Sequence, residues 1–117
     1  MDNNLGEIIV YQTEDGLTHV DVRFEGDTVW LSKSQMADLF QRDRTNIGRH
    51  ISNIFKEKEL DEKSNVQKMH VPNSDRPVEY YSLAVIISVG YRVKSLRGTQ
   101  FRQWATERQT LEHMILS

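Results

Sequence analysis

The sequence has no cysteine and only two prolines among its 117 residues. Without thiols, the chain can form no disulfide, no thiolate zinc site and no cysteine nucleophile. The densest apolar stretch covers residues 83–91, far short of the roughly 20 residues that a membrane-spanning helix requires. The polar, acidic start also lacks the basic and apolar segments of a secretory signal. These absences predict a single cytoplasmic domain that is stabilised by core packing and has no membrane association.

Positive charge is scarce at the start of the chain. Residues 1–31 contain seven acidic residues and one basic residue, Arg23, whereas residues 32–117 contain ten acidic and fourteen basic residues. The net charge of −2 therefore divides into −6 (1 − 7) and +4 (14 − 10). Such segregation suits a polyanionic partner better than the total charge suggests.

Motifs for common catalytic and nucleotide-binding chemistry are missing. The sequence contains no phosphate-binding loop, dinucleotide fingerprint or serine-hydrolase elbow, and its four histidines share no metal-ligand spacing. Asp61 and Lys63 could form half of a nuclease site, but they lack a partner aspartate on a predicted strand. We therefore expect no enzyme, no cofactor and no metal site.

The aromatic residues have apolar neighbours and strand or helix spacings, so they predict core packing rather than stacking on bases. They are Trp30, Tyr80, Tyr81, Tyr91, Phe101 and Trp104.

The first part of the chain has the alternation of β-strands. Residues 7–12 are rich in β-branched residues and precede the turn sequence Asp15-Gly16. In residues 18–24, Val20, Val22 and Phe24 alternate with polar residues, and residues 28–31 supply a third apolar run. These segments predict an antiparallel β-meander within residues 1–31.

Two capping signals predict a pair of helices in residues 32–58. Ser32 and Gln35 form a capping box for a short helix that ends near residues 41 and 42. Asp43 is an N-cap for a second helix over residues 44–58. Apolar residues recur at helical spacing in this second helix and predict a buried stripe. They are Ile47, Ile51, Ile54 and Phe55.

This pair of helices predicts a helix-turn-helix, whose second helix enters the major groove of double-stranded DNA. Residues on its outward side can reach base edges, while basic and amide side chains around it can hold phosphates. The base-contact candidates are Thr45, Asn46 and Arg49. The phosphate-contact candidates are Lys33, Arg42, Arg44, His50, Asn53 and Lys56. The alternative is a simple αα-corner whose charged residues form an ordinary solvated face.

Two residues depart from the usual helix-turn-helix pattern. Gln41 stands where a turn glycine is common, and Gly48 lies inside the second helix. Because a glycine there costs about 1 kcal/mol relative to alanine, either another group approaches the backbone or the helix is suboptimal.

Residues 65–81 predict a β-hairpin with a polar tip at residues 72–77. A hairpin after a recognition helix is typical of a winged helix, although a plain surface hairpin fits equally well. The wing candidates are Lys68, His70, Asn73, Ser74 and Arg76.

Two further helices, over residues 83–93 and 100–116, fill the segment 82–117. The sequence therefore predicts one α+β domain of winged-helix-like type. It comprises an N-terminal antiparallel β-meander, a helix-turn-helix with a β-hairpin wing, and two C-terminal helices.

Several sequence motifs resemble the virulence-associated RhuM family. Members of that family are generally longer, and this chain resembles their N-terminal portion. The motifs are GEIIVYQT (6–13), VWLS (29–32), MADLF (36–40), IGRHI (47–51), NIF (53–55), IISVGYRV (86–93) and RGTQFRQWAT (97–106). The resemblance covers residues 6–107 and implies DNA binding. The order of elements is more distantly similar to the BRO N-terminal domain of phage antirepressors, which implies either DNA or a repressor protein as the partner.

We therefore expect a sequence-selective regulator, of bacterial or phage and mobile-element type, that binds double-stranded DNA. A homodimer is expected because one recognition helix offers few base contacts. The alternative is a protein-interaction module, antirepressor or antitoxin-like, without direct DNA binding, and the acidic N-terminal segment favours it.

Overall fold

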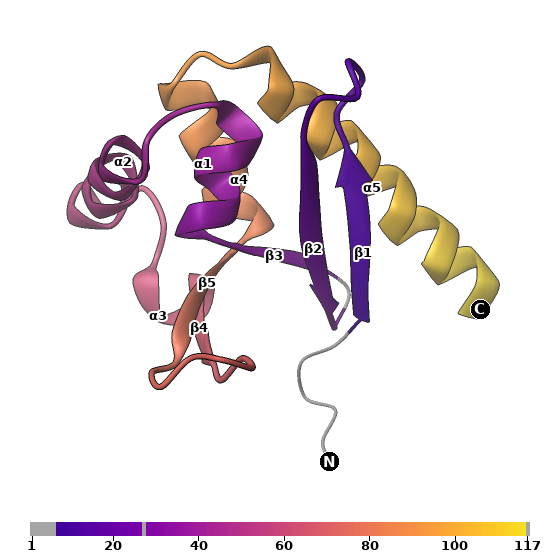
Figure 1. The fold of residues 1–117 in the computed structure, drawn as a ribbon, viewed down its shortest axis with the longest axis horizontal. Coiled ribbons are helices and arrows are strands. Elements are labelled where there is room, and N and C mark those ends of the chain that lie inside the picture. The colour runs from indigo at the N-terminus through magenta and orange to yellow at the C-terminus, as the bar shows by residue number, and fades with distance from the viewer. Residues whose placement is uncertain (1–6, 27, 117) are drawn as a thin grey trace.

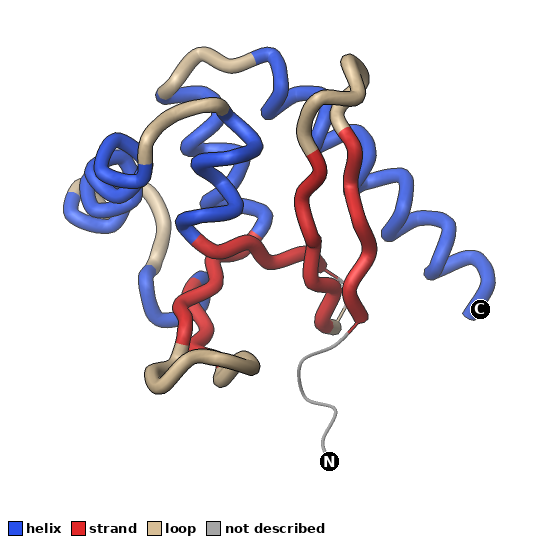
Figure 2. The backbone as a smooth tube through the Cα atoms, in the orientation of Figure 1, coloured by secondary structure: helices blue, strands red, loops and turns tan. Residues whose placement is uncertain are grey.

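The computed structural model describes residues 7–26 and 28–116, with side chains up to residue 108. The described chain is an α+β structure with one five-stranded antiparallel sheet and five helices, as Figures 1 and 2 show. The predicted fold class is therefore confirmed at the level of α+β architecture.

The N-terminal strands form as the alternation predicts. Strand β1 (Glu7–Gln12) pairs with β2 (His19–Glu25), and β2 pairs with β3 (Thr28–Ser32), both in antiparallel register. Gly16 adopts a left-handed φ of 75° in the β1–β2 turn, a conformation that glycine accepts without strain. The meander prediction is confirmed.

The predicted hairpin consists of β4 (Val66–Met69) and β5 (Val78–Ser82). The hairpin is joined to the meander, because β5 also pairs with β3, with Trp30 opposite Ser82. The meander and the hairpin therefore form one sheet of order β1-β2-β3-β5-β4. The sequence could not predict this pairing, because it joins segments about 50 residues apart and no local pattern specifies such a partner.

The helix pair begins at the predicted caps. Helix α1 (Lys33–Phe40) has a complete capping box, in which the Ser32 hydroxyl accepts from Gln35 N and the Gln35 side chain accepts from Ser32 N. Helix α2 (Arg44–Lys56) begins after Asp43, whose carboxylate accepts from Asn46 N at 2.7 Å. The second helix ends at Lys56 rather than at residue 58, where Lys58 has a left-handed φ of 62°.

The remaining helices are α3 (Glu62–Asn65), α4 (Leu83–Arg92) and α5 (Leu96–Leu116). Asp61 caps the single turn of α3 by accepting from Ser64 N, a helical turn that the sequence analysis did not predict. The last helix begins at Leu96 and not at residue 100. Gly98, which precedes the predicted start, lies inside α5 and packs closely on Gly90 of α4.

The helices α1, α2, α4 and α5 contribute to one main core with the inner side of the sheet. The predicted stripe of α2 belongs to this core, since Ile47, Ile51 and Ile54 are buried and Phe55 is half-buried. The aromatic prediction holds except at Tyr91, which is 71% exposed. Local apolar neighbours do not reveal which side of α4 faces solvent.

In Figure 1, α2 lies at one side of the molecule, while β1, β2 and α5 lie at the other. The described helices include none that is long and apolar enough to cross a membrane.

Candidate nucleic-acid interface

The turn between α1 and α2 is held by backbone geometry and one arginine. Gln41 takes the left-handed conformation (φ 58°, ψ 49°) that glycine adopts more easily, which is why glycine is common at this position of the turn. The Arg42 guanidinium donates to the carbonyl oxygens of Phe40 and Gln41, and to Val93 O at 3.0 Å. Arg42 therefore fixes the turn to the end of α4, and it forms no ion pair with a carboxylate of the described residues.

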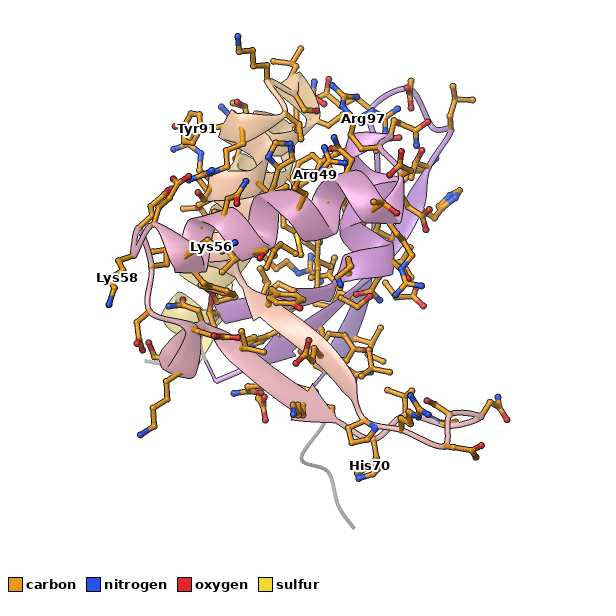
Figure 3. The ribbon with its side chains drawn as sticks, turned by 90° about the vertical axis from the view of Figure 1, so that its left-hand side faces the viewer. Arg49, Lys56, Lys58, His70, Tyr91 and Arg97 are labelled. Atoms are coloured by element: carbon orange, nitrogen blue, oxygen red, sulfur yellow. The ribbon has the colours of Figure 1, made fainter. Side chains whose placement is uncertain are left out.

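The outward side of α2, which we call the outer face, consists of Thr45, Arg49, Ser52 and Lys56. All four are exposed, as their helical positions opposite the isoleucine stripe require. Figure 3 shows α2 crossing the front of the molecule, with Arg49 and Lys56 along it. Asn46 differs from its neighbours, because it is half-buried and its Oδ1 is enclosed by the protein. Thr45 and Arg49 are thus the more accessible of the three base-contact candidates.

Gly48 has a neighbour that the sequence did not reveal. A Cβ atom at this position would lie 3.4 Å from the Lys33 Nζ and 3.5 Å from its Cδ and Cε. The side chain of Lys33 therefore crosses α2 at the glycine. Because these are ordinary van der Waals distances to a flexible side chain, an alanine would fit at this position, which favours the second interpretation, a suboptimal helix residue.

Ion pairs divide the basic residues into two groups. Arg92 contacts Glu57 at 2.9 Å and Glu59 at 2.7 Å, and Arg97 contacts Asp15 at 3.1 Å. By contrast, Arg44, Arg49 and Lys56 of α2 form no ion pair with any carboxylate in the part of the chain that the structure describes. The free positive charge of the helix pair is thus available to an external anion.

His50 lies among arginines near the join of α2 and α4. Burial lowers the pKa of His50 below its usual 6.5, and the nearby charges of Arg92, Arg49 and Arg42 lower it further. The imidazole is therefore mostly uncharged at neutral pH, so it can donate a hydrogen bond to a phosphate but adds little charge. Asn53, another phosphate candidate, is half-buried.

The hairpin and the helix pair meet at a groove of about 470 Å³, which we call the basic groove. Its cationic lining residues are Lys33, Arg44, Lys68 and Arg76, and the other lining residues are Ser32, Ser34, Pro77, Val78, Glu79 and Tyr81. The structure thus brings two predicted phosphate candidates together with two predicted wing candidates. His70 and Asn73 are exposed at the hairpin tip and do not line the groove.

The lining residues Ser32, Ser34, Glu79 and Tyr81 were not predicted as part of the site. No sequence signal identifies them, because the groove exists only where β5 pairs with β3 beside the start of α1. Over the described residues, no group of three or more histidine, aspartate or glutamate side chains could hold a metal ion.

The fold and site define a small α+β protein with an exposed polar helix face beside a basic groove. The chain belongs to the Virulence protein RhuM family, whose profile matches residues 58–116, half of the chain. The matched segment contains β4, β5, α4 and α5, whereas α1 and α2 lie outside it. No curated protein and no solved structure matches the chain. These comparisons give no support to the resemblance to the BRO domain.

Proposed function

We propose that the chain binds double-stranded DNA through α2, with α1 and α2 acting as a helix-turn-helix in a cytoplasmic transcriptional regulator. The observation that carries the proposal is the open outer face of α2. Thr45 and Arg49 are exposed there, and Arg44, Arg49 and Lys56 have no ion-pair partner among the described residues. A helix of this kind can reach base edges in the major groove while its basic residues contact phosphates.

Arg49 is the strongest candidate for sequence recognition. An arginine can donate two hydrogen bonds to guanine, and each such bidentate contact discriminates by about 1–3 kcal/mol. Thr45, one turn earlier on the outer face, is placed to contact an adjacent base. Lys56 is at the other end of α2 and can contribute a contact to the backbone phosphates.

The regulator is proposed to act as a homodimer. A single helix of 13 residues makes few base contacts, and two-fold pairing on two half-sites doubles them. Light scattering of the free chain and of its complex with a selected duplex measures the stoichiometry directly.

The decisive experiment is selection from a random duplex pool, followed by binding measurements at several salt concentrations. Arg49→Ala should weaken binding to selected sites by about 1–3 kcal/mol and relax the preference at one position. Lys56→Ala should weaken binding to all duplexes similarly and reduce the salt dependence. Arg102→Ala, at an exposed arginine of α5, is the matched control. Unchanged binding by both α2 variants would refute the assignment of α2.

A second candidate function is a protein-interaction module, and a different surface favours it. Tyr91 and Leu96 are each 71% exposed and line a cavity of about 390 Å³ between α4 and α5. Exposed apolar side chains around a hollow are typical of protein contacts. Retention of a stable protein partner, with no retention on duplex DNA at low salt, would select this function over DNA binding.

A further inference from the structure

Uncompensated positive charge gathers in the basic groove from three parts of the chain. Lys33 comes from α1, Arg44 from α2, and Lys68 and Arg76 from the β4–β5 hairpin. In residues 7–26 and 28–108, none of these four cationic groups has an ion-pair or hydrogen-bond partner. Glu79 is the one acidic residue of the lining, so the groove has an excess of three positive charges (4 − 1).

This excess differs from the environment of Arg92 and Arg97, which have acidic partners. Arg92 and Arg97 are paired with Glu57, Glu59 and Asp15. The Glu79 carboxylate, by contrast, accepts a hydrogen bond from the Tyr81 hydroxyl at 3.0 Å and pairs with no lysine or arginine of the described chain. Cations that share a groove repel one another. An anion bound between them adds attractive interactions that offset this repulsion.

Most of the residues that line the basic groove are polar or charged. Small-molecule pockets are lined mainly by apolar side chains. Here seven of the ten lining residues are polar or charged, and the aliphatic stems of the lysines and arginines contribute apolar surface beside Pro77, Val78 and Tyr81. The groove is therefore suited to an extended, charged ligand that stays in contact with water.

We propose that the basic groove seats the phosphodiester backbone of one DNA strand, held jointly by the hairpin and the start of α1. This inference rests on the proposed function and adds a second point of attachment to it. Arg44 lines the groove and directly precedes Thr45, the first candidate base contact on α2. A strand seated in the groove therefore passes beside the start of α2, so the groove sets the register in which α2 meets the bases.

Lys33 connects the two surfaces physically. Its side chain crosses α2 at Gly48, and the same residue lines the basic groove. The ammonium group of Lys33 is thus placed between the hairpin and the outer face of α2. A DNA backbone that continues from the basic groove to the outer face of α2 would pass this group.

The test compares two double variants with the wild-type chain. Lys68→Gln with Arg76→Gln removes both hairpin cations, and Lys94→Gln with Arg102→Gln removes one exposed lysine and one exposed arginine beside the α4–α5 cavity. All four side chains are exposed, so both variants should fold, which circular dichroism checks. Affinity for a selected duplex and for a random duplex is measured between about 50 and 200 mM salt, and amide shifts are followed during titration with inorganic phosphate alone.

The hairpin variant should bind both duplexes more weakly with unchanged sequence preference. Each lost phosphate contact lowers the salt slope by about 0.9, so the wild type should lose about tenfold more affinity than the hairpin variant over that salt range. The control variant should keep the wild-type slope. A hairpin variant with the wild-type slope would overturn the proposal, even if Arg49→Ala still weakened binding and so supported the function of α2.

The phosphate titration distinguishes failure of the basic-groove proposal from failure of the proposed DNA binding through α2. If the wild type bound no duplex, the proposed function would be wrong. The groove would still be an anion site if phosphate shifted the amides of Lys33, Arg44, Lys68 and Arg76 and the hairpin variant abolished those shifts. Absence of both duplex binding and phosphate shifts would refute both proposals.

Discussion

Two helical glycines occupy opposite surroundings, and the difference predicts opposite effects of the same substitution. A Cβ at Gly48 would meet only the flexible side chain of Lys33, at 3.4 Å or more. A Cβ at Gly98 would lie 3.2 Å from the Gly90 Cα and 3.2 Å from Cε1 of the Phe40 ring. Space around a residue, and not its helical position alone, therefore decides whether alanine is tolerated.

Gly48→Ala should stabilise the protein by up to about 1 kcal/mol, because alanine has the higher helix propensity and Lys33 can move by a few tenths of an ångström. Urea unfolding, followed by circular dichroism, measures the free energy of unfolding. A decrease in that free energy would show that Lys33 is held rigidly over α2.

His50 should make the stability depend on pH. Burial and the charges of Arg92, Arg49 and Arg42 lower its folded-state pKa below 6.5, whereas the unfolded chain takes up a proton near pH 6.5. The free energy of unfolding should therefore fall as the pH falls through 6.5 towards the folded-state pKa, and His50 should impose no penalty above 6.5.

His50→Gln should flatten this decline, which urea unfolding at about pH 5.5 and about pH 7.5 detects. His70→Gln, at the exposed hairpin tip, is the control for replacing a histidine by glutamine. Equal pH profiles for the wild type and His50→Gln would contradict the prediction.

At the scale of elements, the sequence predicted the caps of α1 and α2 and the inward stripe of α2. It could do so because a cap and its amides lie within three residues, and because buried positions recur with the helical period. The same reasoning missed the single turn of α3, which has no buried residue to give an apolar signal.

Asp43→Ala should destabilise the protein by about 1 kcal/mol, because α2 loses the acceptor for Asn46 N. Asp43→Asn should retain most of the stability, since asparagine caps helices comparably well. Thermal or urea unfolding of the two variants checks this order. Equal losses in both would indicate that the charge of Asp43, rather than its hydrogen bond, stabilises the start of α2.

At the scale of the whole molecule, α1, α4 and α5 meet where Phe40 contacts Gly90 and Gly98. Phe40 is 1% exposed, and Phe101 of α5 is fully buried in the same core. This close approach explains why α5 has a glycine at position 98.

Gly98→Ala should destabilise the protein by about 1–3 kcal/mol, because the new methyl group meets backbone and a packed ring that cannot move away freely. Comparison of its unfolding free energy with that of Gly48→Ala checks the prediction, since helix propensity favours alanine in both. A stabilising effect at Gly98 would mean that α4 and α5 can separate without loss.

The sequence by itself determined the strands of the meander, the capped helix pair and the outer face of α2. These features depend on contacts between residues close in the chain, which a one-dimensional pattern records. Only the tertiary structure decided that β5 joins β3, that Lys33 and Arg44 face Lys68 and Arg76, and that Arg92 and Arg97 are neutralised. Those outcomes depend on which distant segments pack together, and that choice is made by the burial of the whole core at once.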